Sequence, residues 1–209
     1  MSHRSQPVTV AVVTGGHSYD AVEFDRVWRS LDGIDAVVQH MDEFAAAPKA
    51  TREAFDAIVF YTMLRENPPA ALSELGATEQ GIVMLHHALF AYPEWESWQA
   101  MTGIVVDNGF YSMGETLTSE IVDPSHPVTE GIAPWTMVDE TYRLTEPDGD
   151  SEVLIAYDHP RSMRAVAWTR QCRASRVFCY QAGHDGHAWS TDGFRAVLTR
   201  GIAWLARRL

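Results

Sequence analysis

The stretch VTVAVVTGG, residues 8–16, decides the fold of this chain. It is a nearly continuous run of β-branched residues ending in two glycines, which is typical of a parallel strand covered by helices on both faces. Asp20 then offers an N-cap for a helix over 21–31, where apolar residues recur at helical spacing. A strand followed directly by a helix predicts a βα unit at the start of the fold.

The same alternation continues through the first hundred residues. Further strands are predicted over 35–40, 55–63 and 81–85, with a polar stretch between the first two. Helices are predicted over 70–75 and 93–103, each opened by proline, which loses no hydrogen bond at the first helical position. Strands that alternate with helices imply a doubly wound α/β sheet, mostly parallel, with helices on both faces.

From residue 103 to residue 180 the predicted strands follow one another without helices between them. They cover 115–123, 136–144, 151–158, 164–170 and 176–183, with turn signals such as DPSHP and EPDGD in between. No linker-like composition separates this part from the rest, so we expect a β segment added to the sheet and a single domain over 1–209. An amphipathic helix over 192–209 would pack back on the sheet.

Composition excludes several classes of function. The 209 residues carry a formal net charge of −12, which argues against a nucleic-acid partner because its phosphates would be repelled. Two cysteines, Cys172 and Cys179, fit neither a disulfide framework nor a metal-binding spacing, which favours a reducing compartment. No signal peptide is evident, and no apolar run reaches the roughly 20 residues of a membrane-spanning helix. We therefore expect a cytoplasmic protein that does not bind membranes.

Polar residues gather where the predicted parallel strands end. Ligands of open α/β sheets bind outside these carboxyl ends. The residues found there are His17, Tyr19 and Asp20 after the first strand, Tyr61, Thr62 and Arg65 after the third, His86 and His87 after the fourth, and His184, Asp185 and His187 after the last. Five of the nine histidines thus lie at strand ends, which predicts a shared site at this edge of the sheet.

Two kinds of chemistry fit these histidines. His184 and His187 could lie on one side of a helical turn as zinc ligands, completed by imidazoles from other strand ends. Alternatively the histidines could act as general acids and bases, since imidazole titrates near neutrality. Each histidine also has a purely structural interpretation, and the HDGH segment could simply cap the last helix. Neither GxGxxG nor GxxxxGK[ST] occurs, so no nucleotide cofactor is expected.

Two further features bear on a ligand site. Glu140 and Tyr142 alternate along the predicted strand 136–144, either as ligand contacts or as part of an exposed β face. Trp189 offers a flat apolar surface that could stack on a sugar ring, although most tryptophans fill cores. The elbow in GIVMLHHALF, residues 81–90, carries two histidines where a nucleophilic serine or cysteine would stand, so nucleophilic catalysis is not expected.

Taken in order, the motifs of this chain resemble those of the ThuA-like family, named for trehalose utilisation. They are VTGGHSYD, GIVMLHHALF (where the family has a Gly-x-x-x-Leu-His-x-Ala pattern), DPSHPVTEGI, VDETYRL, AVAWTR, and AGHD followed by FRAVLTRGIAWLA. The resemblance covers nearly the whole chain and departs in two places. RQCRASRVF replaces a Gly-Lys-Gly-Arg turn before the last strand, and GFYSMGETL lies where relatives differ in length, so substrate specificity could differ there.

The resemblance implies a flavodoxin-like sheet of the glutamine amidotransferase-like superfamily, with an added β segment. In the amidotransferases the elbow carries a nucleophilic cysteine, whereas here His86 stands closest to that position. Without a thiol the glutaminase mechanism is not available. The family's recurrent polar positions match His17, His86, Glu140, Tyr142, His184 and Asp185 of this chain.

The resemblance also implies a role in carbohydrate metabolism. We expect an enzyme that acts on a sugar or keto-sugar derivative by histidine acid–base or metal-assisted chemistry, with zinc or another divalent metal as the cofactor. The expected catalytic residues are His86, His184 and Asp185; the substrate-binding residues are Tyr19, Glu140, Tyr142 and Trp189; the metal ligands are His17, His86, His184 and His187. The alternatives are a non-catalytic protein that binds a sugar or another metabolite, or a partner subunit of a sugar dehydrogenase. The expected partners are a small sugar-like ligand and either further copies of this chain or a sugar dehydrogenase.

Overall fold

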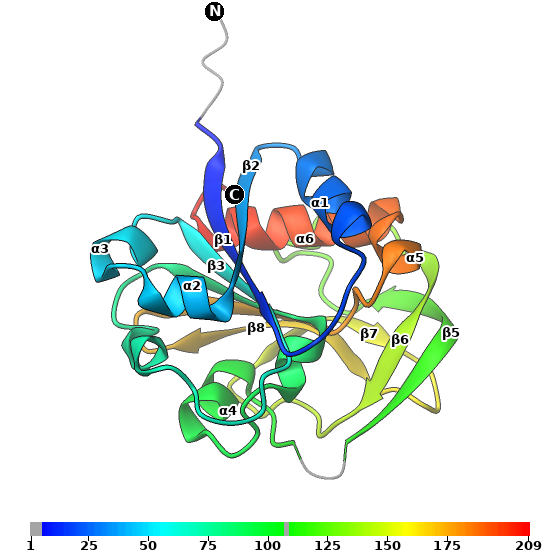
Figure 1. The fold of residues 1–209 in the computed structure, drawn as a ribbon. Coiled ribbons are helices and arrows are strands. Elements are labelled where there is room, and N and C mark those ends of the chain that lie inside the picture. The colour runs from blue at the N-terminus through cyan, green and yellow to red at the C-terminus, as the bar shows by residue number, and fades with distance from the viewer. Residues whose placement is uncertain (1–5, 107–108) are drawn as a thin grey trace, which may run out of the picture.

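The computed structural model describes residues 6–106 and 109–209. In these residues the strands form a nine-stranded sheet in the order β2-β1-β3-β4-β9-β8-β7-β5-β6 (Figure 1). None of the described helices is both long and apolar enough to cross a membrane.

The first half of the sheet is parallel. Its strands are β2 (Ile34–His40), β1 (Val8–Gly15), β3 (Ala57–Thr62), β4 (Gly81–Leu85) and β9 (Ser175–Tyr180). All residues of β3 and β4 are buried, as expected for strands with helices on both faces. β2 alternates between half-buried and exposed residues because it is the edge strand. The predicted α/β fold, with a parallel sheet between two layers of helices, is confirmed, and an antiparallel half makes the whole sheet mixed.

The second half of the sheet is antiparallel. It consists of β8 (Ala165–Cys172), β7 (Glu152–Tyr157), β5 (Phe110–Ile121) and β6 (Thr136–Arg143). The predicted added β segment is therefore present, with one correction. The strand predicted over 176–183 is β9, which lies in the middle of the sheet and runs parallel to β4.

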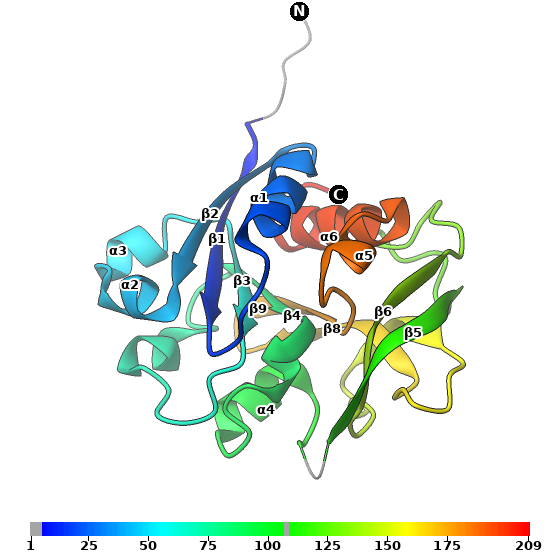
Figure 2. The same ribbon diagram turned by 45° about the vertical axis from the view of Figure 1, so that its right-hand side comes forward.

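β5 and β6 leave the plane of the sheet as a curved arm (Figure 2). The last residues of β5 pair with β7, whereas its first residues pair with β6 alone. β5 begins at Phe110, five residues before the predicted start at 115. The sequence did not reveal these first residues because they are mostly exposed and lack the alternation of buried and exposed positions. This arm brings the C-terminal end of β6 back towards the parallel half.

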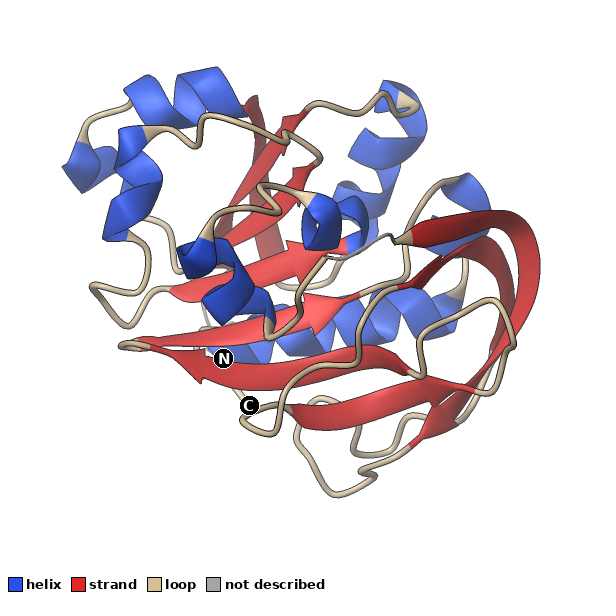
Figure 3. Ribbon diagram, turned by 90° about the horizontal axis from the view of Figure 1, so that it is seen from below, coloured by secondary structure: helices blue, strands red, loops and turns tan. Residues whose placement is uncertain are grey.

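Helices cover both faces of the sheet (Figure 3). One apolar core includes α1 (Ala21–Ser30), α5 (Gly186–Trp189) and α6 (Asp192–Leu205). The other includes α2 (Met41–Ala46), the 3-10 helices η1 (Ala70–Glu74) and η2 (His86–Phe90), and α4 (Glu96–Thr102); α3 (Lys49–Arg52) follows α2. The Asp20 side chain accepts hydrogen bonds from the backbone at the start of α1, which confirms the predicted N-cap.

Several helix boundaries differ from the predictions. The helix expected from Pro93 begins at Glu96, because residues 93 and 94 form a turn before it. The helix expected over 70–75 is a short 3-10 helix, and the last helix ends at Leu205. α2 and α3 lie in the stretch described above as polar, and they are too short for a hydrophobic period to reveal them.

Candidate functional site

The centre of the site is the elbow where β4 turns into η2. His86 is the first residue of η2, is fully buried, and has a φ of +55°. A residue with a β-carbon in this left-handed region costs about 1–3 kcal/mol, and such residues cluster at functional sites. The packing of β4 and η2 therefore holds an unfavourable backbone conformation that aims the His86 side chain across the ends of the neighbouring strands.

One hydrogen bond fixes the protonation pattern of the His86 ring. Its Nδ1 lies 2.7 Å from the backbone oxygen of Gln181, in the loop after β9. A carbonyl oxygen can only accept, so Nδ1 must carry a hydrogen. In the neutral ring Nε2 then has no hydrogen and presents a lone pair on the other side. Partners of this kind orient histidines that bind metals.

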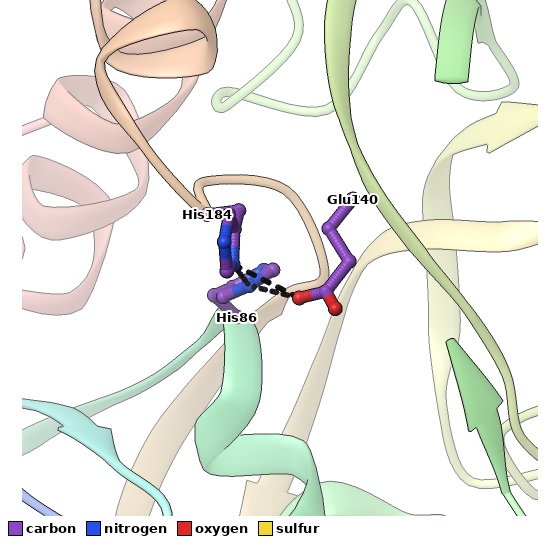
Figure 4. A group of neighbouring side chains, drawn as sticks. All are labelled: His86, Glu140 and His184. Atoms are coloured by element: carbon purple, nitrogen blue, oxygen red, sulfur yellow. Dashed lines mark hydrogen bonds and ion pairs between the residues drawn. The ribbon is translucent and has the colours of Figure 1, made fainter. Parts of the chain in front are cut away.

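Three side chains converge where that lone pair points (Figure 4). His86 Nε2 lies 3.0 Å from Glu140 Oε2 and 3.2 Å from His184 Nδ1. His184 Nδ1 lies 3.0 Å from Glu140 Oε2. The three residues come from the ends of β4 and β9 and from β6, so both halves of the sheet contribute. We call them the His86–Glu140–His184 cluster.

The spacing of these three atoms fits a metal ion. Ligand atoms about 2.0–2.1 Å from a tetrahedral zinc ion lie about 3.3 Å from each other. The three measured separations are slightly smaller than this value and nearly equal. Two imidazoles and a carboxylate are also a ligand set that zinc prefers in catalytic sites. The cluster could therefore hold a divalent metal.

Tyr142 completes the polar contacts of the cluster. Its hydroxyl lies 2.6 Å from His86 Nε2 and 3.0 Å from Glu140 Oε2. Burial, followed by the nearby Glu140 carboxylate, raises the pKa of Tyr142 well above its ordinary value. The phenol is thus a neutral hydrogen-bond donor beside the cluster.

The ionisation of the cluster reflects its contacts. Burial alone would raise the pKa of Glu140, but the close contacts of its carboxylate with the imidazoles of His184 and His86 outweigh burial and hold this pKa far below its ordinary value. The hydrogen bond to Glu140 raises the pKa of His184, against the opposing effect of burial. Glu140 is therefore an anion, and it favours a positive charge on the groups that face it.

A second carboxylate supports the cluster from behind. Asp139 is buried and accepts hydrogen bonds from the backbone nitrogens of Gly183, at 2.7 Å, and His184, at 3.0 Å. Burial raises the pKa of Asp139, although these hydrogen bonds and the nearby His86 oppose the rise. Asp139 thereby fixes the loop after β9 against β6 and positions His184.

Two more histidines flank the cluster. His17 follows the glycine pair after β1, where Gly16 has a φ of +74° and a β-carbon would lie 2.7 Å from the backbone nitrogen of Leu64. His87 is buried, and its ring centroid lies 4.5 Å from that of His17. Burial, followed by the neighbouring His86, lowers the pKa of His87 to about 2, so its ring is neutral. Burial, followed by His184, also lowers the pKa of His17.

The cluster opens into a pocket of about 400 Å³, within the range of about 300–1,000 Å³ typical of small-molecule sites. The lining residues are His17, Met63, Arg65, His87, Phe90, Gly109, Tyr111, Met113, Glu140, Tyr142 and His184. Four of the residues named from the sequence as catalytic, substrate-binding or metal-binding (His17, Glu140, Tyr142 and His184) lie in this lining, and His86 lies directly behind it.

Four other predicted site residues lie outside the lining. The Asp185 side chain caps α5, and His187 contacts Asp185 with its own side chain 75% exposed. His184 precedes the cap of α5, so it and His187 do not share a helical turn. The Trp189 indole nitrogen donates to the Gly183 backbone oxygen, and Tyr19 packs against Phe24.

Other contributing residues were not singled out from the sequence. Asp139 and Gln181 could have been suspected, since each is a polar residue next to a named motif position. The apolar residues Met63, Phe90, Tyr111 and Met113 gave no signal, because apolar side chains at these places are equally typical of core or surface. Tyr111 and Met113 belong to GFYSMGETL, where substrate specificity was expected to vary.

Comparisons with known structures show the same fold. A ThuA-like protein from Parabacteroides merdae matches with a TM-score of 0.77 and 18% identity, over 96% of this chain and 90% of that one. A second ThuA-like protein, from Bacteroides uniformis, matches with a TM-score of 0.77 and 16% identity, over 98% and 94% of the two chains. A cytoplasmic protein from Salmonella typhimurium matches with a TM-score of 0.70 and 13% identity, over 93% and 98%.

The sequence comparisons give one match. No curated protein matches the chain. The model of the ThuA family, described as trehalose utilisation, matches residues 8–205, which include every strand of the sheet and all three residues of the cluster. This chain therefore belongs to the ThuA (trehalose utilisation) family.

Proposed function

We propose that this protein is a metal-dependent enzyme of carbohydrate metabolism, which binds a sugar or keto-sugar derivative in the pocket. The divalent metal is held by the His86–Glu140–His184 cluster, and zinc suits its two nitrogens and one oxygen best. The role in sugar metabolism rests on the family, and the chemistry rests on the cluster.

The observation that carries the proposal is the short distance between two acceptors. His86 Nε2 and Glu140 Oε2 lie 3.0 Å apart, and the hydrogen bond from Nδ1 leaves Nε2 of the neutral ring without a hydrogen. Two lone pairs at this distance repel unless a positive charge lies between them. A metal ion supplies that charge to all three cluster atoms at once. A second proton on His86 would supply a positive charge between His86 Nε2 and Glu140 Oε2 alone. This is the metal-free acid–base alternative.

The position of the cluster favours a catalytic metal over a structural one. Glu140 and His184 line the pocket, so a bound ion would face the ligand and keep a coordination position for it. A divalent ion there supplies Lewis acidity, polarising a ligand carbonyl or lowering the pKa of a bound water. The Tyr142 hydroxyl, in contact with both His86 and Glu140, is placed to donate a proton to a ligand oxygen.

Glutaminase chemistry is not part of the proposal. The elbow that would carry a nucleophilic thiol carries His86 instead. Cys179 is buried inside β9, and burial raises the pKa of its thiol far above the ordinary value, so it is inert. Cys172 lies at the far end of β8, where the turn into β9 contacts Gly76.

Metal content tests the proposal. After zinc loading and removal of excess, we expect about one equivalent of tightly bound zinc in the wild type and a loss of that zinc in His86→Asn and His184→Asn. His187→Asn is the control, since His187 is exposed and outside the pocket, and it should retain the wild-type content. Zinc-loaded and metal-free proteins are then compared for turnover of disaccharides and their keto derivatives.

Three results would overturn it. If the wild type binds no zinc, manganese or iron, the metal-dependent mechanism is excluded and the metal-free acid–base mechanism remains. Metal that stays bound in both His86→Asn and His184→Asn would place it elsewhere. Turnover that persists unchanged after complete removal of the metal would contradict metal-assisted catalysis even if the cluster binds zinc.

A further inference from the structure

The pocket contains buried imidazole nitrogens without hydrogen-bond partners. Among the described residues, neither ring nitrogen of His87 has a partner, and the same holds for Nδ1 of His17. His87 is buried, with 2% of its surface exposed. Buried polar groups in native proteins are nearly always paired, and an unpaired one needs an explanation. Because His87 lines the pocket, a bound ligand is the explanation that the structure offers.

These imidazoles lie directly beside the cluster. The ring centroid of His87 is 5.3 Å from that of His86, and the centroid of His17 is 5.6 Å from that of His184. The His87 ring is held in place by Tyr61, whose ring centroid lies 4.1 Å away. A ligand atom bound at the cluster would therefore have its next atom within reach of His87.

The other lining residues determine the orientation of a bound ligand. Met63, Phe90, Tyr111 and Met113 give the lining its apolar surface, and Tyr111 and Met113 come from the exposed start of the β5 arm. Among the described lining residues the polar side chains, apart from the Tyr111 hydroxyl, are Glu140, His184 and Tyr142, the two flanking imidazoles, and Arg65. An oxygen-rich ligand would place its oxygens next to the histidines and its carbon skeleton against the apolar side chains.

We infer that His87 is a positioning residue that hydrogen-bonds the ligand oxygen adjacent to the one bound at the cluster. The ligand class is thereby narrowed to compounds with oxygens on neighbouring carbons: α-hydroxy ketones, α-hydroxy acids and vicinal diols of monosaccharide size. A hydroxyl group suits either tautomer of a neutral imidazole, because it can both donate and accept. This inference rests on the proposed function, since it takes the cluster as the anchor of the first oxygen.

A matched pair of probes tests it by calorimetry. D-Gluconate carries a hydroxyl next to its carboxylate, and 2-deoxy-D-gluconate lacks that one oxygen. We expect the wild type to bind gluconate about tenfold more tightly than the deoxy compound, and His87→Phe to bind both equally, as in a double-mutant cycle. His126→Phe is the control, because His126 is a mostly buried histidine packed on Trp204, outside the pocket, and it should keep the wild-type preference.

Each outcome has one meaning. Equal binding of the two probes by the wild type, or no binding of gluconate, overturns the inference without any variant. A preference that survives in His87→Phe also overturns it, and His87→Asn replaces this variant if the phenylalanine prevents folding. Zinc content is measured on the same samples. A protein that binds none of zinc, manganese and iron would refute the proposed function, whereas bound zinc with no probe preference would refute this inference alone.

Discussion

The two halves of the sheet contribute differently to the candidate site. The parallel half supplies His86 and His184 from strand ends, on buried strands with helices on both faces. The antiparallel half supplies Glu140 and Tyr142 from inside β6, whose pairing with β5 alone bends it back towards those ends. The parallel half therefore provides fixed imidazoles at a place where such folds bind ligands, and the antiparallel half adds the carboxylate charge that the proposed metal centre requires.

The largest expected effect comes from removing the charge supplied by the antiparallel half. Glu140→Gln keeps the shape of the side chain but removes the anion from between two imidazoles. We expect zinc affinity to fall by more than about 100-fold, the upper range for losing a residue that merely supports a ligand. The measurement is competition with a chelator of known affinity.

Glu120→Gln is the matched control, because Glu120 lies on β5 and forms an exposed ion pair with Arg164. It should leave zinc affinity unchanged. A Glu140→Gln protein that still binds zinc like the wild type would mean that the parallel half forms the site alone, and the comparison of the halves would fail.

The next effect concerns the connection between the halves. The buried Gln181 side chain accepts hydrogen bonds from the Thr141 hydroxyl and the Tyr142 backbone nitrogen, both at 2.9 Å, and its own amide donates to Ala165. Gln181→Ala leaves several buried polar groups unpaired, so we expect a loss of about 2–4 kcal/mol in the free energy of unfolding. Zinc affinity should also fall about 10–100-fold, because β6 loses its alignment with the strand ends.

Urea denaturation and chelator competition measure the two effects. Gln171→Ala, at a mostly exposed position on β8, is the control and should change stability by less than about 0.5 kcal/mol. If Gln181→Ala lowers stability but keeps full zinc affinity, the cluster does not depend on how the halves are aligned.

The smallest expected difference, between two glycine variants, tests the turn that precedes His17. Gly16 and Gly33 share a φ of +74°, but a β-carbon would meet the Leu64 backbone at 2.7 Å at Gly16 and nothing within 4 Å at Gly33. In both alanine variants the free energy of unfolding falls by about 1–2 kcal/mol, because a β-carbon is unfavourable in the left-handed backbone conformation. We expect the free energy of unfolding of Gly16→Ala, measured by urea denaturation, to fall by about 1–3 kcal/mol more, because its β-carbon overlaps the Leu64 backbone. Equal losses would show that the close approach in this turn is easily relaxed.

The sequence predicted the parallel half well, for physical reasons. Runs such as 8–16 and 81–85 are β-branched or apolar throughout because both of their faces are covered, and a rule about strand ends then located His17, His86 and His184. The set of lining residues was less predictable. Apolar residues such as Met113 occur equally in cores, on surfaces and in pockets, so their residue type does not indicate a site. The curvature of the β5–β6 arm depends on which strands pair, and this pairing joins residues that are far apart in the sequence.

His187 illustrates the limit of spacing arguments. Two histidines three residues apart suggested a shared helical turn, but Asp185 is the N-cap of α5, so His184 lies before the helix and His187 within it. The cap turns the two side chains into different surroundings. The sequence predicts Glu140 as a substrate contact, but in the fold β6 lies beside the ends of β4 and β9, where the Glu140 carboxylate contacts both imidazoles.

A crystal structure of the zinc-loaded protein, with anomalous data at the zinc edge, tests the central claim most directly. We predict one anomalous peak about 2.0–2.1 Å from His86 Nε2 and His184 Nδ1, with a Glu140 oxygen as the third protein ligand and one position open to the pocket. A zinc-soaked crystal with no peak among these three side chains, or with zinc bound at other residues alone, would contradict the account.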